Sequence, residues 1–140
     1  ALLYAAARAQ LVDEALSPLL ANGEIVVLDR FVDSSLAYQG AGRGLGVERV
    51  RAINEFATAG LVPDRTLLLS LDPGLGRARS AERGVPPDRL ERQGDEFFAR
   101  IAAGYAALAR ADPERIRTID ASLPAPDVLA QALGAIADLL

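Results

Sequence analysis

The side chains in this sequence that could do chemistry are arginines, carboxylates, tyrosines and amides. All 15 basic residues are arginine, and lysine, histidine and cysteine do not occur among the 140 residues. These residues therefore hold no Ser-His triad, no thiol nucleophile, no imidazole or thiolate metal site and no Schiff-base lysine. Among the chemistries still open are the binding of phosphates by guanidinium groups and of a hydrated divalent cation by carboxylates.

Asp29 and Arg30 stand together at the end of an apolar run, 24–29, that predicts a strand. A carboxylate in that place can hold the water shell of Mg²⁺, because Mg²⁺ prefers oxygen ligands and keeps most of its waters. The neighbouring guanidinium offers a planar fork of donors to phosphate oxygens. The pair alone is equally compatible with an aspartate that caps the following helix and an arginine on the surface.

Tyr4 and Arg8 are four residues apart, so they share one face of a predicted helix. An aromatic ring there could stack on a nucleobase while the guanidinium one turn away donates to a base carbonyl. The alternative is a tyrosine in the core and an arginine on the surface. The spacing by itself does not decide between them.

A cluster of arginines lies further along the chain. Its members are Arg77, Arg79, Arg83, Arg89 and Arg92. They could form a clamp that closes over the phosphates of a nucleotide. They could equally form a solvated helix face paired with neighbouring carboxylates, as most charged runs do.

Strands and helices that alternate along the chain must position these groups. Apolar runs predict strands over 24–29, 66–72 and 115–120. Helical periodicity predicts helices over 1–22, 47–57, 98–108 and 126–140. This alternation indicates an α/β fold with a parallel sheet, in a single domain over 1–140. Ligands bind at the carboxyl ends of such strands, where Asp29 and Arg30 stand.

The composition narrows the partners and the location that we expect. A net charge of −4 argues against a general nucleic-acid-binding surface, which would need clustered positive charge. The apolar runs are too short for a membrane span, and we find no signal peptide, so we expect a cytoplasmic protein with no membrane partner. The first residue is Ala1, which leads us to expect a processed product or a fragment.

Several segments resemble, in order, the bacterial-type thymidylate (dTMP) kinases. The most telling is DRFVDSSLAYQGAGRGLG, residues 29–46, which matches that family's DR-aromatic motif, Ser/Thr pair, AYQG and Gly-Arg-Gly segment. The other matching segments are LLYAAARAQ (2–10), NEFATAGLVPDRTLLLSLDP (54–73), DRLE (88–91), GY (104–105) and IDAS (119–122). The resemblance implies a P-loop NTP hydrolase-like parallel sheet flanked by helices, with three of the usual five strands present.

The resemblance also implies a binding site for dTMP. Tyr4 matches an aromatic residue, usually phenylalanine, that stacks on thymine, and Arg8 matches an arginine that donates to a thymine carbonyl. Gln39 matches an amide that pairs with the edge of the base. The remaining matches are Ser35 beside the base, Tyr38 against the sugar, where it would crowd a 2′-hydroxyl, Arg30 on the phosphate, and Arg43 in a loop near the substrate.

The activity implied is transfer of the γ-phosphoryl group of ATP to dTMP. Asp29 matches an acidic residue near Mg²⁺ and the phosphates, and would hold the ion through water. Arg79, Arg83 and Arg89 fall in the family's lid, about residues 77–95 here, where bacterial members place arginines over the ATP phosphates. The catalytic candidates are Asp29, Arg30, Arg83 and Arg89. Such catalysis is mostly positioning and charge neutralisation, so it needs no histidine or cysteine.

One part of the family pattern, the P-loop with its lysine, does not occur in these residues. The Gly-rich segment 40–46 is not that loop, because no lysine follows it and no strand leads into it. We therefore expect the chain to supply the dTMP site and the lid but not the P-loop, and to be a poor catalyst alone. Family members are homodimers through helices that match 1–20 and 47–59, so we expect a homodimer. The alternatives are another nucleoside or nucleotide kinase, and a non-catalytic dimerisation or binding remnant.

Overall fold

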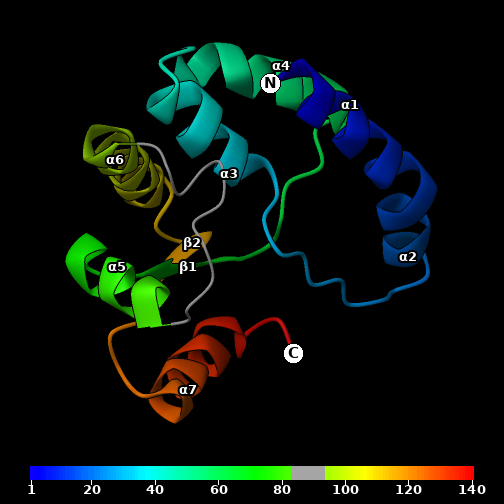
Figure 1. Ribbon diagram of the computed structural model, residues 1–140. Helices are drawn as coiled ribbons and strands as arrows, with labels where there is room; N and C mark the ends of the chain where they lie inside the picture. The colour runs from blue at the N-terminus through cyan, green and yellow to red at the C-terminus, as the bar shows by residue number, and fades with distance from the viewer. Residues whose placement is uncertain (83–93) are drawn as a thin grey trace. The chain divides into compact units, whose positions relative to one another are not determined.

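The computed structural model describes residues 1–82 and 94–140 (Figure 1). They form two compact units, one of Ala1–Val62 with Ala99–Tyr105 and the other of Pro63–Phe98 with Ala106–Leu140. The long helix α6, Asp95–Ala111, contributes its middle to the first unit and both ends to the second. None of the helices formed by the described residues has the length and apolar character needed to cross a lipid bilayer.

The first unit opens with one helical stretch made of α1 (Leu2–Leu11), the π-helical segment η1 (Val12–Leu16) and α2 (Ser17–Ala21). This stretch confirms the helix predicted over 1–22. The wider π turn comes just before Pro18, which has no N–H to donate and whose ring would clash with the preceding turn of a regular α-helix. Gly23 ends the stretch with a φ of 77°, which glycine adopts without steric cost.

A second helical stretch begins with α3 (Val32–Ser35), which runs into the π-helical segment η2 (Leu36–Gly42), and α4 (Val47–Ala57) follows. Helix α4 approaches η2 so closely that a Cβ on Gly40 would lie 2.9 Å from the Cα of Val47. Helix α4 also packs against α1 (Figure 1). A small apolar core lies between the two stretches and consists of Val12, Leu16 and Phe31, with Val26, Val32 and Leu61 packed against them.

The second unit is built on two parallel strands, β1 (Thr66–Ser70) and β2 (Ile116–Asp120), with Leu68 opposite Thr118. The strands predicted near 66–72 and 115–120 and their parallel pairing are thus confirmed. Parallel strands need a crossover connection, and the chain between these two contains α5 (Pro73–Glu82) as well as α6. Helix α7 (Ala125–Ile136) packs on β2 and has proline in its first turn, as predicted for Pro126.

Arg65 ties the end of the chain to the strands of the second unit. Its side chain is 9% exposed and donates to the carbonyl oxygen of Glu114 and, at 2.5 Å, to the carboxylate of Asp138. These contacts join three places that are distant in sequence: the start of β1, the turn before β2 and the residues after α7.

The strand predicted over 24–29 does not form. Residues 24–28 run without strand pairing and are largely exposed, with Ile25 at 73% and Val27 at 90%. A β-branched apolar run becomes a strand only where another strand supplies hydrogen bonds and side-chain neighbours. In the part of the chain that the structure describes, β1 and β2 pair only with each other, so it holds two strands rather than three.

One predicted boundary, the end of β1, differs from the structure, whereas the lid stays a prediction. The strand β1 ends at Ser70 because Asp72 caps α5 instead, accepting the N–H groups of Gly74 at 2.8 Å and Leu75 at 3.1 Å. The segment 77–95 assigned to a lid begins inside α5, which extends to Glu82, and its last residue starts α6. Residues 83–93 lie outside the described part of the chain.

Replacing Gly40 by alanine is expected to lower the free energy of unfolding by about 1–3 kcal/mol, because the new Cβ would overlap the backbone of Val47. Gly134→Ala is the matched control, since nothing lies within 4 Å of its Cβ position and alanine favours helix α7 by about 1 kcal/mol. Urea unfolding followed by circular dichroism compares the two variants. Equal effects on stability would contradict the close approach of α4 to η2.

Candidate functional site

Arg8 lies at the centre of a side-chain network that joins α1, α3 and α4. Its Nη1 donates to Oδ1 of Asn54, and its Nη2 donates to the carbonyl oxygen of Phe31 at 3.2 Å and to Oγ of Ser35 at 3.1 Å. The guanidinium carbon also lies 5.4 Å from the centre of the Phe31 ring. All three acceptors are neutral oxygens, which hold the guanidinium in place without neutralising its charge.

Asn54 is a member of this network that the sequence analysis did not single out. It is 2% exposed, and its Nδ2 donates to the carbonyl oxygen of Val50 at 2.7 Å. That bond fixes which way the amide points, so that its oxygen accepts from Arg8. The sequence offered two signals: Asn54 begins the segment 54–73 that resembles the family, and it is a polar residue four positions after Val50 on a predicted helix.

The surroundings of Arg8 determine which ligand it would favour. Desolvation by burial lowers the pKa of Arg8 below its ordinary value. A guanidinium nevertheless stays protonated in proteins. A partly desolvated cation with neutral neighbours gains most from an oxygen that carries a partial or full negative charge. The network therefore suits a ligand that presents a carbonyl or anionic oxygen to Arg8.

Arg30 and Tyr38 form a second pair of predicted site residues that the structure brings together. Arg30 has a φ of 68°, in the left-handed region that costs an L-residue about 1–3 kcal/mol. This turn of the backbone places its guanidinium carbon 5.3 Å from the centre of the Tyr38 ring, a cation–π arrangement. Strained backbone of this kind is concentrated at functional sites.

The two groups meet on one short segment, 35–39, where α3 passes into η2. Ser35, which is 4% exposed, accepts from Arg8, and Tyr38 lies against Arg30. Gln39 is half-buried on η2 next to Tyr38. Single π turns in helices are rare and often occur at functional sites. Segment 35–39 is therefore the point at which the predicted base-binding and phosphate-binding residues converge.

Tyr105 of α6 is a second residue near the site for which the sequence indicated no role. Its hydroxyl lies 2.8 Å from Oγ of Ser34, and its ring meets that of Tyr38 edge-on, with centroids 6.3 Å apart and planes at 81°. Burial raises the pKa of Tyr105, and the hydrogen bond with Ser34 partly opposes that rise. In the sequence, Tyr105 belongs to the GY segment that resembles the family, but nothing there indicated which residues it contacts.

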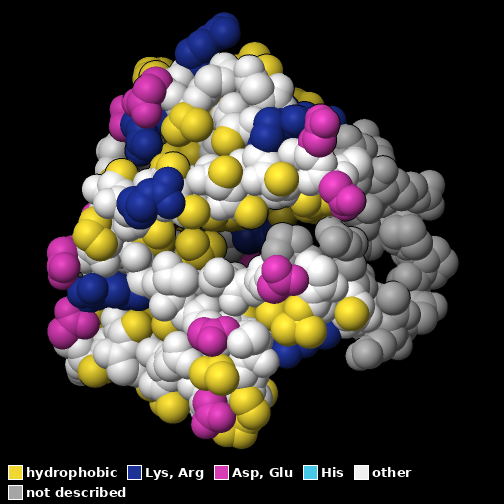
Figure 2. Space-filling model, turned by 90° about the vertical axis from the view of Figure 1, so that its left-hand side faces the viewer, with side chains coloured by type: hydrophobic (Ala, Val, Ile, Leu, Met, Phe, Trp, Pro, Cys, Tyr) yellow, Lys and Arg dark blue, Asp and Glu magenta, His cyan; other side chains and the backbone are white. Residues whose placement is uncertain are grey.

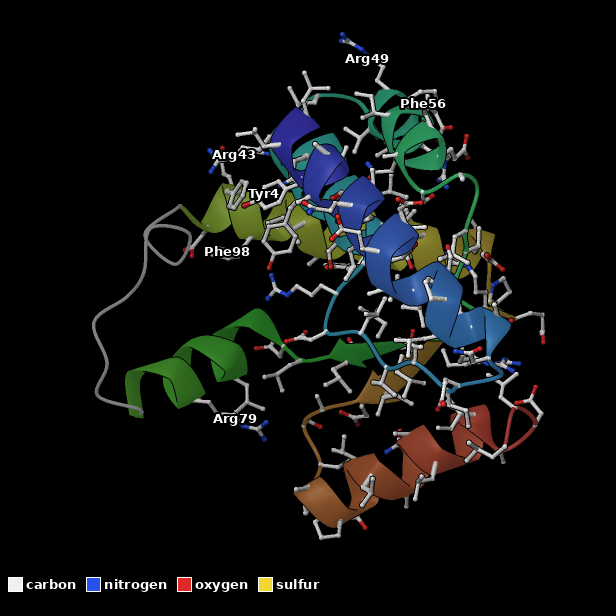
Figure 3. The ribbon with its side chains drawn as sticks, turned by 90° about the vertical axis from the view of Figure 1, so that its right-hand side faces the viewer. Tyr4, Arg43, Arg49, Phe56, Arg79 and Phe98 are labelled. Atoms are coloured by element: carbon white, nitrogen blue, oxygen red, sulfur yellow. The ribbon has the colours of Figure 1, made fainter. Side chains whose placement is uncertain are left out.

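Four predicted site residues lie at the surface of the first unit, and one of them is Arg30. Tyr4, on α1, is 59% exposed, and Asp29 and Arg43 are exposed as well. Figure 3 shows the side chains of Tyr4 and Arg43 extending from their elements. The described residues contain no group of three or more acidic side chains that could hold a metal ion. On the face drawn in Figure 2, arginines are dispersed among apolar and acidic side chains rather than gathered in one patch.

Arg79, predicted to contact ATP, lies on α5 in the second unit (Figure 3). It donates to the carbonyl oxygens of Ala121 at 2.8 Å and Ser122 at 3.1 Å, and so holds the loop after β2. Asp120 accepts from the N–H and the hydroxyl of Ser122 in the same loop, and these bonds hold its pKa below the ordinary value. Contact with ATP stays a prediction for Arg79, and Arg83 and Arg89 lie outside the described residues.

The chain resembles known proteins over nearly its whole length. The profile of the thymidylate kinase family matches residues 1–132. The chain is 48% identical over 100% of its length to a thymidylate kinase of Halorhodospira halophila, of which it covers 65%. It is 49% identical over 98% of its length to one of Deinococcus radiodurans, of which it covers 66%. The chain thus spans just under two thirds of the length of the relatives it matches.

Tyr105 is expected to ionise above the ordinary phenol pKa of 10.0. Because the folded state then holds its proton to higher pH than the unfolded state, the associated stability is present below about pH 10 and is lost as the pH rises further. The near-ultraviolet absorbance of the wild type minus that of Tyr105→Phe isolates this titration. The control is the same absorbance difference recorded in denaturant, where the pKa of Tyr105 should return to the ordinary value. An absorbance change centred at or below the ordinary phenol pKa in the folded protein would contradict the burial of this phenol.

Proposed function

Since the chain belongs to the thymidylate kinase family, we propose that it supplies the dTMP-binding part of an enzyme that transfers the γ-phosphoryl group of ATP to dTMP, giving dTDP. The observation that carries the proposal is that two arginines meet on segment 35–39: Ser35 accepts from Arg8, and the ring of Tyr38 lies against Arg30. Two guanidinium groups held on neutral partners suit a ligand that has carbonyl oxygens at one end and a phosphate at the other.

The base end of dTMP would bind to Arg8 and Gln39. The three bonds that hold Arg8 use only part of its guanidinium, which leaves donors for a thymine carbonyl. The Gln39 amide can accept from thymine N3–H and donate to O4, whereas cytosine presents the opposite pattern. Tyr4, one helical turn before Arg8, would stack on the base, and Ser35 would lie beside it. The exposure of Tyr4 leaves room for solvent around its hydroxyl.

The sugar and phosphate end of dTMP would bind to Tyr38 and Arg30. The ring of Tyr38 would lie against the deoxyribose, where a 2′-hydroxyl would be crowded. Arg30 would donate hydrogen bonds to the phosphate, and the left-handed backbone at this residue would orient its planar guanidinium. Arg43, at the end of η2, would lie near the substrate. The acceptor in this reaction is already an anion, so positioning and charge neutralisation suffice without a strong general base.

Asp29 would hold Mg²⁺ through water. It is an exposed carboxylate directly before Arg30, and it belongs to no group of three or more acidic side chains in the described part of the chain. A single carboxylate fits Mg²⁺, which keeps several waters and takes its other ligands from substrate phosphates. When bound, the ion neutralises negative charge on the phosphates. The contribution of this chain is the carboxylate of Asp29 and the neighbouring guanidinium of Arg30.

The P-loop that binds the ATP phosphates would lie outside these 140 residues. They contain no lysine, and about a third of each relative lies beyond the match. In this proposal the P-loop lies in such a part, and these residues alone bind dTMP without turning over ATP. Arg83 and Arg89 stay predicted to cover the ATP phosphates.

A second copy of the chain is the proposed protein partner. Leu2, Leu3 and Phe56 are 70%, 87% and 91% exposed, and they lie on α1 and α4, which pack side by side. Figure 3 shows Phe56 projecting outward from α4. Exposed apolar side chains on neighbouring helices mark interaction surfaces. A homodimer would cover them.

Calorimetric titration with dTMP, dCMP and dGMP tests the proposed ligand. The chain is expected to prefer dTMP, and Gln39→Ala should weaken dTMP binding about tenfold, because it removes hydrogen bonds to the edge of the base. Gln10→Ala is the matched control, since this exposed amide bonds to Glu14 on the same helix. It should leave the affinity unchanged.

Other outcomes of this titration would count against the proposal. A preference for dGMP would favour a different nucleotide kinase, and no binding of any of the three nucleotides would contradict the assignment of the site. Normal kinase turnover by the 140 residues alone would contradict the proposed location of the P-loop.

A further inference from the structure

One face of helix α6 lies directly on η2, the segment that carries Tyr38 and Gln39. At Gly104 the approach is so close that a Cβ would lie 2.9 Å from the Cβ of Ala41 and 3.4 Å from the Cα of Ala37. One turn earlier, Nε of Arg100 donates to the carbonyl oxygen of Gly42 at 3.1 Å. Helix α6 therefore contacts η2 at Gly104 and at Arg100, and Tyr105 directly follows Gly104.

Tyr105 makes two contacts with the neighbourhood of Tyr38. Its ring meets the Tyr38 ring edge-on, at 6.3 Å between centroids, and its hydroxyl pairs with Oγ of Ser34 at 2.8 Å. The guanidinium of Arg30 lies 5.3 Å from the centre of the same Tyr38 ring. Tyr38 is thus in contact with a cation and with the edge of a second aromatic ring.

The bond to Ser34 makes the position of the Tyr105 ring specific. A half-buried hydroxyl without a partner costs free energy, so the ring is most stable where its hydroxyl reaches Ser34. Ser34 lies on α3, the helix that leads directly into η2. The hydrogen bond therefore fixes Tyr105 relative to the element that carries Tyr38. Neither Tyr105 nor Ser34 has a part in the proposed binding of dTMP.

We propose that Tyr105, through its bond to Ser34 and its edge contact with Tyr38, is a positioning residue that sets the preference of the site for 2′-deoxyribonucleoside monophosphates over their ribonucleotide counterparts. This inference rests on the proposed function, in which Tyr38 lies against the sugar. A ring excludes a 2′-hydroxyl only if it cannot move aside. Packed interiors resist such displacement, whereas a ring without support on one side can shift to admit the extra oxygen.

The test compares the affinities for dTMP and for ribothymidine 5′-monophosphate, two ligands that differ only in the 2′-hydroxyl. Tyr105→Phe keeps the ring and removes the hydroxyl, and Ser34→Ala removes the same bond from the other side. Each variant is expected to lower the ratio of the two affinities about three- to tenfold, mainly by improving the binding of the ribonucleotide. The double variant should lower it no further than either single variant, because both remove one interaction.

Ser17→Ala is the matched control, since Ser17 lies on α2 and is exposed. It should leave the ratio unchanged, and circular dichroism checks that all variants are folded. An unchanged ratio in folded Tyr105→Phe and Ser34→Ala would overturn the inference while leaving the proposed function intact. Equal weakening of both ligands would also overturn it, because that result indicates a structural role alone. A wild type that does not bind dTMP would overturn the proposed function and this inference together.

Discussion

The site in the first unit depends on the bonds that hold the guanidinium of Arg8. One side chain from α1 donates to Asn54 on α4, to the carbonyl oxygen of Phe31 and to Ser35 on α3. Removing a cation from water is unfavourable unless its donors find partners, so the bonded state requires all three elements to be in place. The same neutral acceptors leave the positive charge available to a ligand. One interaction therefore serves both the packing of the helices and the chemistry of the site.

The remaining parts of the site follow from how closely its helices approach one another. Gly40 lets α4 reach the backbone of η2, and Gly104 lets α6 do so from another direction. Between them η2 presents Tyr38 and Gln39, and the left-handed turn at Arg30 aims a second guanidinium at the Tyr38 ring. The candidate site is thus assembled from segments far apart in the sequence, with glycines where backbones must meet.

Much of this arrangement could be predicted from the sequence, and its failures have physical causes. Periodicity predicted the first helical stretch, α4, α6 and α7, because burial of one face follows the pitch of the helix, but it did not predict α3, η2 or α5. The motif at 29–46 singled out Arg30, Ser35 and Tyr38, whose roles in binding stay predictions. The run 24–29 was wrongly predicted as a strand because its composition is that of a strand, whereas pairing depends on a neighbour that composition does not reveal. Asn54 and Tyr105 lie in segments that match the family, but no role was predicted for them, because their contacts span 46 and 71 residues of sequence.

The most direct test of this account is a dTMP titration of the chain labelled with ¹⁵N at its arginine side chains, followed by nuclear magnetic resonance. The account predicts that the guanidinium signals of Arg8 and Arg30 shift together and saturate at the same dTMP concentration. The signal of Arg115, which is held by Asp112 and Thr66 in the second unit, should stay in place. Saturation with dTMP that leaves the signals of Arg8 and Arg30 unchanged would contradict the account.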